Sequence, residues 1–86
     1  MPHIKDYKGK RAHMIGIGGS SMSGLAGMLM QAGVIVTGSD GVSSYMTKML
    51  IDQGIPVTVG HFEKNVHGAD LVIYSAAISA ENPERA

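Results

Sequence analysis

Residues 16–24, with the sequence GIGGSSMSG, form a glycine-rich segment between an apolar run at 12–17 and a helical pattern of apolar residues. Glycine at positions 16 and 18 lets the backbone turn tightly and approach a ligand closely, and Gly19 extends that freedom. A helix that begins in such a turn directs the N–H groups of its first residues outward, at the positive end of the helix dipole. The segment therefore predicts a strand, a turn and a helix, with the N–H groups of residues 19–23 around a phosphate.

Apolar runs along the rest of the chain predict four short strands, at residues 12–17, 34–37, 55–59 and 70–74. The second run is apolar and β-branched on successive residues, which is typical of a parallel strand buried on both faces, and Gly38, Ser39 and Asp40 are expected to end it. Pro56 places the third strand at an edge of the sheet.

Two helices are predicted between these strands. The first has an apolar face and stops at Gly33; its face consists of Met22, Leu25, Ala26 and Leu29. The second is capped by Ser43 or Ser44 and ends near Gln53, and a loop at 61–69 has room for a helical turn.

This alternation of strands and helices indicates an α/β fold. We predict a Rossmann-like, three-layer domain with a mainly parallel sheet of strand order 3-2-1-4, room for a fifth strand, and helices on both faces. Residues 1–11 form a lead-in segment and residues 12–86 the single domain. Ligands of such sheets bind where the strand order reverses, so the turn after Ile17 and the segment after Tyr74 should face each other.

The glycine-rich segment matches the dinucleotide fingerprint G-x-G-x-x-G except at its third glycine, where Ser21 stands. Asp40 follows Ser21 by 19 positions, where an acidic residue commonly binds a ribose in NAD-binding folds. The same residue could read another nucleotide or cap a turn through its own backbone. A glycine-rich turn that serves packing alone is the alternative to nucleotide binding.

Other histidines and charges give weaker signals. His61 follows the third predicted strand on the same rim as Gly18 and Asp40, where it could contact a base or be a solvated loop residue. His3, His13 and His67 lack the spacing of metal ligands, so no metal site is predicted. Lys8, Lys10 and Arg11 are expected to form a solvated cluster before the first strand.

Composition and missing motifs exclude several function classes. Lys and Arg number 7, as do Asp and Glu, so no net charge favours nucleic acid or an anionic membrane. There is no cysteine, and no apolar run approaches the ~18 residues of a membrane span, so we expect a cytoplasmic protein. The sequence contains neither the P-loop motif nor a nucleophile paired with a base, so binding is predicted and no catalytic residue is assigned.

The end of the chain carries a helix-start signal. Asn82, Pro83 and Glu84 have the residue types of an N-cap, a first helical position and an acidic first turn. We therefore expect a fragment of a longer protein, with a disordered tail as the alternative.

Four segments together resemble the amino-terminal domain of the Mur ligase family of peptidoglycan ligases: HMIGIGGSSMSGLA at 13–26, GSD at 38–40, GH at 60–61, and YSAAI followed by NPE within 74–84. The resemblance implies a first domain that binds the UDP part of UDP-N-acetylmuramate. It further implies a central ATPase domain and a C-terminal domain elsewhere in the parent chain. The parent enzyme would use ATP and magnesium to activate the muramyl carboxylate for attack by L-alanine.

Site residues carried over by position fall into three groups. Around the diphosphate the resemblance implies Gly18, Gly19, Ser20, Ser21, Met22 and Ser23, and Gly16 of the same turn is also expected to bind the substrate. On the uridine side it implies Ser39 and Asp40, with His61, and on the opposing wall Ser75, Ala76 and Ala77. The family's G-x-G-G-x-G-M-S run has a glycine where this chain has Ser21. The competing interpretations are a related ligase that recycles murein peptides and an NAD-binding module of a dehydrogenase or channel regulator.

Overall fold

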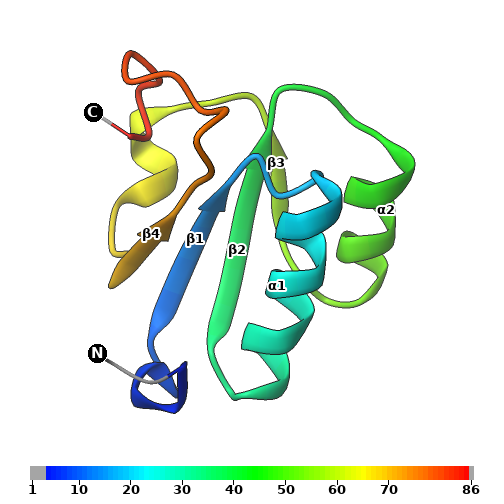
Figure 1. The fold of residues 1–86 in the computed structure, drawn as a ribbon, viewed down its shortest axis with the longest axis vertical. Coiled ribbons are helices and arrows are strands. Elements are labelled where there is room, and N and C mark those ends of the chain that lie inside the picture. Colours follow the sequence, from blue (N-terminus) through cyan, green and yellow to red (C-terminus); the bar gives the residue numbers. More distant parts are fainter. Residues whose placement is uncertain (1–3, 86) are drawn as a thin grey trace.

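A parallel four-stranded sheet forms the centre of the computed structural model, which describes residues 4–85 (Figure 1). The order of the strands is β3-β2-β1-β4. Their bounds are β1 (Arg11–Ile15), β2 (Ile35–Asp40), β3 (Val57–Val59) and β4 (Leu71–Ile73). In the parallel register, Ala12 of β1 lies opposite Val36 of β2 and Leu71 of β4. The predicted order 3-2-1-4 is confirmed, and residues 4–85 contain no fifth strand.

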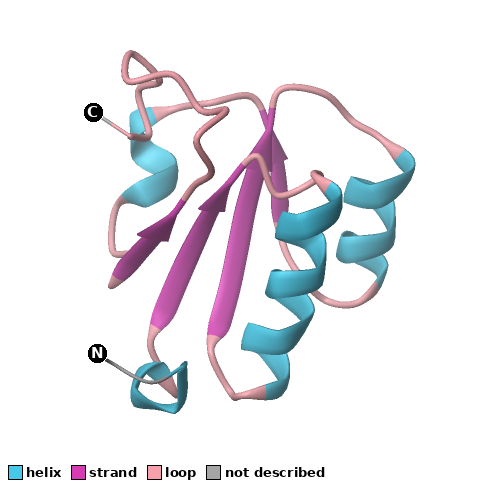
Figure 2. Ribbon diagram, viewed as in Figure 1, coloured by secondary structure: helices cyan, strands magenta, loops and turns pink. Residues whose placement is uncertain are grey.

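One face of the sheet carries the apolar core beneath two helices, α1 (Ser20–Gln31) and α2 (Tyr45–Asp52), which lie together on one side in Figure 2. Ala26 and Leu29 of α1 are buried, as is Leu50 of α2. They pack on Ala12, Met14 and Val36, because alternate residues of a strand point to the same face. The predicted apolar face of α1 is thus confirmed, and Ser44, one of the two predicted caps, is the cap of α2.

The other face of the sheet carries polar side chains of β1 and β2, and neither α1 nor α2 covers it. The short 3-10 helix η2 (Glu63–Val66) lies on this side (Figure 1), as does the carboxylate of Glu84 near the end of the chain. Arg11 and His13 of β1 and Thr37 of β2 point toward it, and the Arg11 guanidinium donates to the Asn65 carbonyl of η2 at 2.8 Å. The predicted Rossmann-like class, with helical elements on both faces, is confirmed; on this face the element is a single 3-10 turn.

Several element boundaries differ from those predicted. β1 ends at Ile15 because Gly16 takes a φ of 75°, which turns the chain. β2 continues through Asp40 instead of ending at Thr37, since it pairs with β3 along residues 38–40. Ile35 is 55% exposed, so the prediction that this strand is buried on both faces was wrong at its start. β3 begins after Pro56 and is an edge strand, as predicted.

A second 3-10 helix, η1 (Ile4–Tyr7), precedes β1. Residues 1–3, which include His3 of the predicted lead-in, and residue 86 lie outside the described residues. Within residues 4–85, no helix has both the length and the apolar character that crossing a membrane requires.

Candidate functional site

An open cleft of about 540 Å³ lies at the carboxyl ends of β1, β2 and β4. Most of the predicted site residues line it: Gly16, Gly18, Gly19, Ser20, Ser21, Met22, Asp40, Ser75 and Ala77. Val42, Ser44 and Ile78 complete the lining and were missed by the sequence analysis, although each lies within four residues of a predicted site residue. The turn after β1 and the segment after β4 therefore face each other, as the predicted strand order requires.

The first wall of the cleft is the glycine-rich turn, which is bonded to the end of β2. The N–H groups of Gly16 and Ile17 both donate to the Ser39 carbonyl, at 2.8 and 3.0 Å. The N–H of Gly19 then donates back to the Gly16 carbonyl at 3.2 Å, which closes the turn. Backbone bonds therefore fix the position from which α1 begins.

Asp40 braces this turn directly. Its Oδ2 accepts a hydrogen bond from the Gly18 N–H at 2.9 Å, and its Oδ1 accepts one from the Val42 N–H at 3.3 Å. A Cβ added to Gly18 would lie 2.8 Å from the same Oδ2 and 3.0 Å from Thr47 Cγ2, so the close approach requires glycine. Asp40 therefore holds the glycine-rich turn and also caps its own loop. The cap was one of the alternatives predicted for this residue. A ribose contact by the same carboxylate stays a prediction.

The start of α1 is left open toward the cleft. Its N-cap is Gly19, which has no side chain to accept from the first-turn N–H groups, and the first turn contains no acidic residue. In α2, by contrast, Ser44 and Thr47 cap each other's backbone N–H groups, at 3.2 and 2.8 Å. Because the first N–H groups of a helix have no partners within it, α1 presents donors and a positive dipole end to the cleft.

Ser21 occupies the third glycine position of the fingerprint without strain. It is an exposed residue of the first turn of α1, and no residue other than glycine among those described has a positive φ. A serine is therefore compatible with this backbone, and its side chain borders the cleft.

Four predicted site residues do not line the cleft. Ser23 is buried in α1, where its hydroxyl donates to the Ser20 carbonyl at 3.0 Å. Ala76 is exposed between Ser75 and Ala77, which with Ile78 form the second wall of the cleft, opposite the glycine-rich turn. Ser39 and His61 direct their side chains to the polar face of the sheet instead, and the Ser39 hydroxyl lies 3.4 Å from His61 Nδ1.

At that polar face, Ser39 and His61 meet the carboxylate of Glu84, which is 3% exposed. Oε1 of Glu84 accepts a bond from the Ser39 hydroxyl and lies 3.2 Å from His13 Nε2 and 3.4 Å from His61 Nδ1. Oε2 accepts bonds from the Phe62 N–H at 3.0 Å and from Asn65 Nδ2 at 2.5 Å. The carboxylate is therefore satisfied by donors from four parts of the chain.

These contacts set the charges within the group. Burial alone would raise the pKa of Glu84, but the hydrogen bonds from Ser39, Asn65, the Phe62 N–H and His13 outweigh it and lower the pKa to about 2. Burial lowers the pKa of His13, against the opposing effect of Glu84. A neutral His13 that donates from Nε2 to Glu84 can accept the Thr37 hydroxyl at Nδ1, 2.9 Å away.

This group was not found from the sequence. His13 stands in an otherwise apolar run, and Glu84 was assigned only to the first turn of a helix. Asn82 does cap the backbone there, since its Oδ1 accepts from the Glu84 N–H at 2.9 Å. The two histidines and the glutamate lie up to 71 residues apart in sequence, so no local pattern links them.

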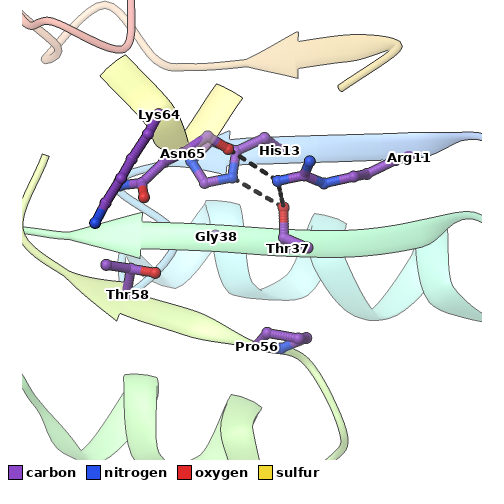
Figure 3. Close-up of a pocket in the computed structure, with 8 residues that line it drawn as sticks. All are labelled: Arg11, His13, Thr37, Gly38, Pro56, Thr58, Lys64 and Asn65. Carbon is purple, nitrogen blue, oxygen red and sulfur yellow. Dashed lines mark hydrogen bonds between the residues drawn. The ribbon is translucent and has the colours of Figure 1, made fainter. Parts of the chain in front are cut away.

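A second cavity, of about 310 Å³, lies on the polar face of the sheet (Figure 3). Arg11 is half-buried at its edge, so the prediction of a solvated cluster was wrong for this residue, whereas Lys8 and Lys10 are exposed as predicted. Its guanidinium donates to the His67 carbonyl at 2.6 Å and to the Asn65 carbonyl at 2.8 Å. Figure 3 shows the arginine, His13 and Thr37 joined by hydrogen bonds. The glycine-rich turn does not border this cavity, and the only helical element at its edge among residues 4–85 is the four-residue 3-10 turn η2, so we assign no phosphate to it.

Known proteins are similar to this chain in sequence and in fold. The model of the Mur ligase family, catalytic domain, matches residues 11–86. A UDP-N-acetylmuramate–L-alanine ligase from Clostridium botulinum (strain Kyoto / Type A2) is 51% identical over 81 residues, which is 94% of this chain and 18% of that protein. The ligase of the same name from Acetivibrio thermocellus is 52% identical over 79 residues, 92% of this chain and 17% of that protein.

Two solved structures have the same architecture. The UDP-N-acetylmuramate-alanine ligase of Thermotoga maritima matches with a TM-score of 0.83 and 37% identity, over 87% of this chain and 17% of that chain. A murein peptide ligase from Psychrobacter arcticus matches with a TM-score of 0.75 and 30% identity, over 84% of this chain and 15% of that chain. The chain thus spans less than a fifth of the length of the proteins it matches. With a family model matched over residues 11–86, the chain belongs to the Mur ligase family.

Proposed function

We propose that the cleft between the glycine-rich turn and the segment after β4 binds the diphosphate of UDP-N-acetylmuramate. The observation that carries this proposal is the open start of α1, where an uncapped helix end without acidic residues borders a cleft of about 540 Å³. Phosphate groups bind at such helix ends because the N–H donors and the dipole both favour an anion. The serines at 20 and 21 add hydroxyl donors at the same edge.

The parent protein, on this proposal, is the ATP-dependent ligase that adds L-alanine to UDP-N-acetylmuramate in peptidoglycan synthesis, in the cytoplasm. The names of the relatives that are 51% and 52% identical support this branch of the family over the murein peptide ligase, which is 30% identical. ATP and magnesium would supply activation of the muramyl carboxylate. These 86 residues contain no P-loop, so both would be held by the central domain and this chain would only bind and orient the UDP end.

Isothermal titration of the 86-residue chain tests the proposal, with UDP-N-acetylmuramate, UDP and NAD as separate ligands. We expect heat with the UDP-sugar and with UDP, at similar affinities, because the muramyl end extends away from this domain. NAD should give none at the same concentrations. Binding of NAD without binding of either uridine ligand would refute the proposal and favour the dinucleotide alternative.

A matched pair of variants locates the binding. Gly18→Val places a branched side chain where even a Cβ meets Asp40 and Thr47, and it should abolish UDP binding. Gly27→Val is the control, since Gly27 lies in α1, which follows the turn, and a Cβ there meets nothing within 4 Å. Both proteins are first checked for folding by circular dichroism. Equal loss of binding in the two variants would place the site elsewhere.

A further inference from the structure

We propose that Glu84 is a positioning residue for the nucleotide cleft, which fixes the second wall of the cleft from the opposite side of the sheet. The inference rests on the proposed function for what the cleft binds. Glu84 does not line the cleft: its carboxylate lies on the polar face, where Ser39, His61 and Asn65 surround it.

The carboxylate of Glu84 anchors the end of the segment 74–85 to the sheet. Its carboxylate receives bonds from β1, β2, the loop after β3, and η2, so it holds one end of the segment 74–85 against four separate elements. Removal of the negative charge of Glu84 would leave several of these donors without their acceptor, which is costly in a buried site. Glu84 is therefore a fixed point, and the start of the segment, at the end of β4, is the other.

Between those two points the segment is a series of linked turns. The Ile78 N–H donates to the Ser75 carbonyl at 3.1 Å, and the Asn82 N–H donates to the Ser79 carbonyl at 3.0 Å. Arg85, the residue after the anchor, reaches back so that its Nη1 donates to the Ile78 carbonyl at 2.8 Å. A displacement of the anchored end is thus passed to Ile78 through one side chain as well as along the backbone.

Arg85 strengthens this connection through a second contact. Its guanidinium lies 4.5 Å from the centre of the Tyr74 ring, at the start of the same segment. A cation over an aromatic face is attracted to it. The start, middle and end of the segment are therefore joined, with Glu84 as the attachment to the sheet.

The wall itself has little packing of its own. Ser75 and Ala77 are exposed, and only Ile78 is partly buried, with its Cδ1 3.1 Å from the position of a Cβ on Gly16. Ile78 thus touches the glycine-rich turn across the cleft. Because the lining residues make few buried contacts, the distance between the two walls depends on the anchor at Glu84.

The test compares Glu84→Gln with Glu81→Gln in the 86-residue chain. Glu81 lies in the same segment but is exposed, with its carboxylate bonded to the Ser79 hydroxyl at 2.7 Å, so it provides the same chemical change without the anchor. Two quantities are measured at a temperature where each variant is fully folded by circular dichroism. They are the affinity for UDP and the amide hydrogen exchange of residues 77 and 78, with Gly18 as an internal reference.

We expect Glu84→Gln to weaken UDP binding about 10-fold, because a mobile wall must be ordered on binding. Exchange at residues 77 and 78 should rise while exchange at Gly18 stays unchanged, which a general loss of stability would not produce. Glu81→Gln should match the wild type in both, and Glu84→Asp, which keeps the carboxylate, should recover part of the affinity.

Unchanged exchange at residues 77 and 78 in Glu84→Gln would overturn the inference, whatever its affinity for UDP. Failure of the wild type to bind UDP would instead refute the proposed function, and the exchange measurement would still decide the role of Glu84. If Glu84→Gln does not fold, Asn65→Ala removes one donor to the carboxylate and leaves the others. The same rise in exchange at residues 77 and 78 is then expected, and its absence would overturn the inference.

Discussion

Replacement of Ser21 by aspartate should separate the stability of the domain from its affinity for a nucleotide. Ser21 is the second residue of α1 and lines the cleft, at the uncapped end of the helix. A negative side chain at this position is favoured by the helix dipole, by about 0.3–1 kcal/mol. The same charge would occupy the place that we assign to the diphosphate.

The expected loss of affinity follows from the distance between the two anions. Two unit charges about 5 Å apart repel by roughly 1 kcal/mol in water and 3 kcal/mol at the effective dielectric of a protein surface. Because Ser21 is exposed, the effect should lie between these limits, so Ser21→Asp should weaken UDP binding about 10- to 100-fold. Ser21→Asp should therefore unfold at higher urea concentration than the wild type while binding UDP less tightly.

Gln31→Glu is the matched control, because it adds the same charge to the exposed last residue of the same helix. At a rise of 1.5 Å per residue the two positions are about 15 Å apart, beyond the Debye length of roughly 10 Å at 0.1 M salt. We expect a slightly less stable protein with unchanged affinity. Calorimetric titration with UDP and urea unfolding, both at 0.1 M salt, give the two readouts. Wild-type affinity in Ser21→Asp would refute a diphosphate at the start of α1.

Three further outcomes are expected. Asp40→Ala should raise amide exchange at Gly18 and weaken UDP binding, whereas Asp40→Asn, which keeps an acceptor for the Gly18 N–H, should do less; equal effects would contradict the bracing role. Gly38→Ala should cost about 1–3 kcal/mol in urea unfolding, because its Cβ would lie 2.5–2.8 Å from buried Ile17, and an unchanged midpoint would contradict this packing. Glu84, with its pKa lowered from 4.5 to about 2, should stabilise the fold by roughly 3 kcal/mol above pH 4.5 and lose this as the pH falls toward 2. Unfolding of the wild type and Glu84→Gln across that range measures it, and a difference that does not shrink in acid would contradict it.

Much of the sheet and the first wall of the cleft was predictable because both depend on local signals. Strand order followed from short crossovers of one hand, and the edge position of β3 followed from Pro56. Gly16 and Gly18 were identified because a turn of positive φ and a close approach each require glycine. Such requirements act within a few residues, so they are visible in sequence.

The polar face was not predictable because its contacts join distant residues. His13 follows and precedes apolar residues, and alternation along a strand places it on the face opposite Ala12 and Met14 without any sign of what it meets there. Its partner Glu84 is 71 positions away. A charged residue in the first turn of a helix is usually exposed, so the burial of Glu84 depends on how the segment after β4 folds back.

The carboxyl end of β2 connects the two walls of the cleft through adjacent residues. Because successive side chains of a strand point to opposite faces, Asp40 braces Gly18 on one side while the Ser39 hydroxyl binds Glu84 on the other. The Ser39 carbonyl also accepts the bonds that position Gly16 and Ile17. One strand end therefore sets the first wall directly and the second wall through its anchor, and a register slip of one residue would exchange the two roles. On the proposed function, a nucleotide would meet walls already held in place, so less of its binding energy would be spent on ordering the protein.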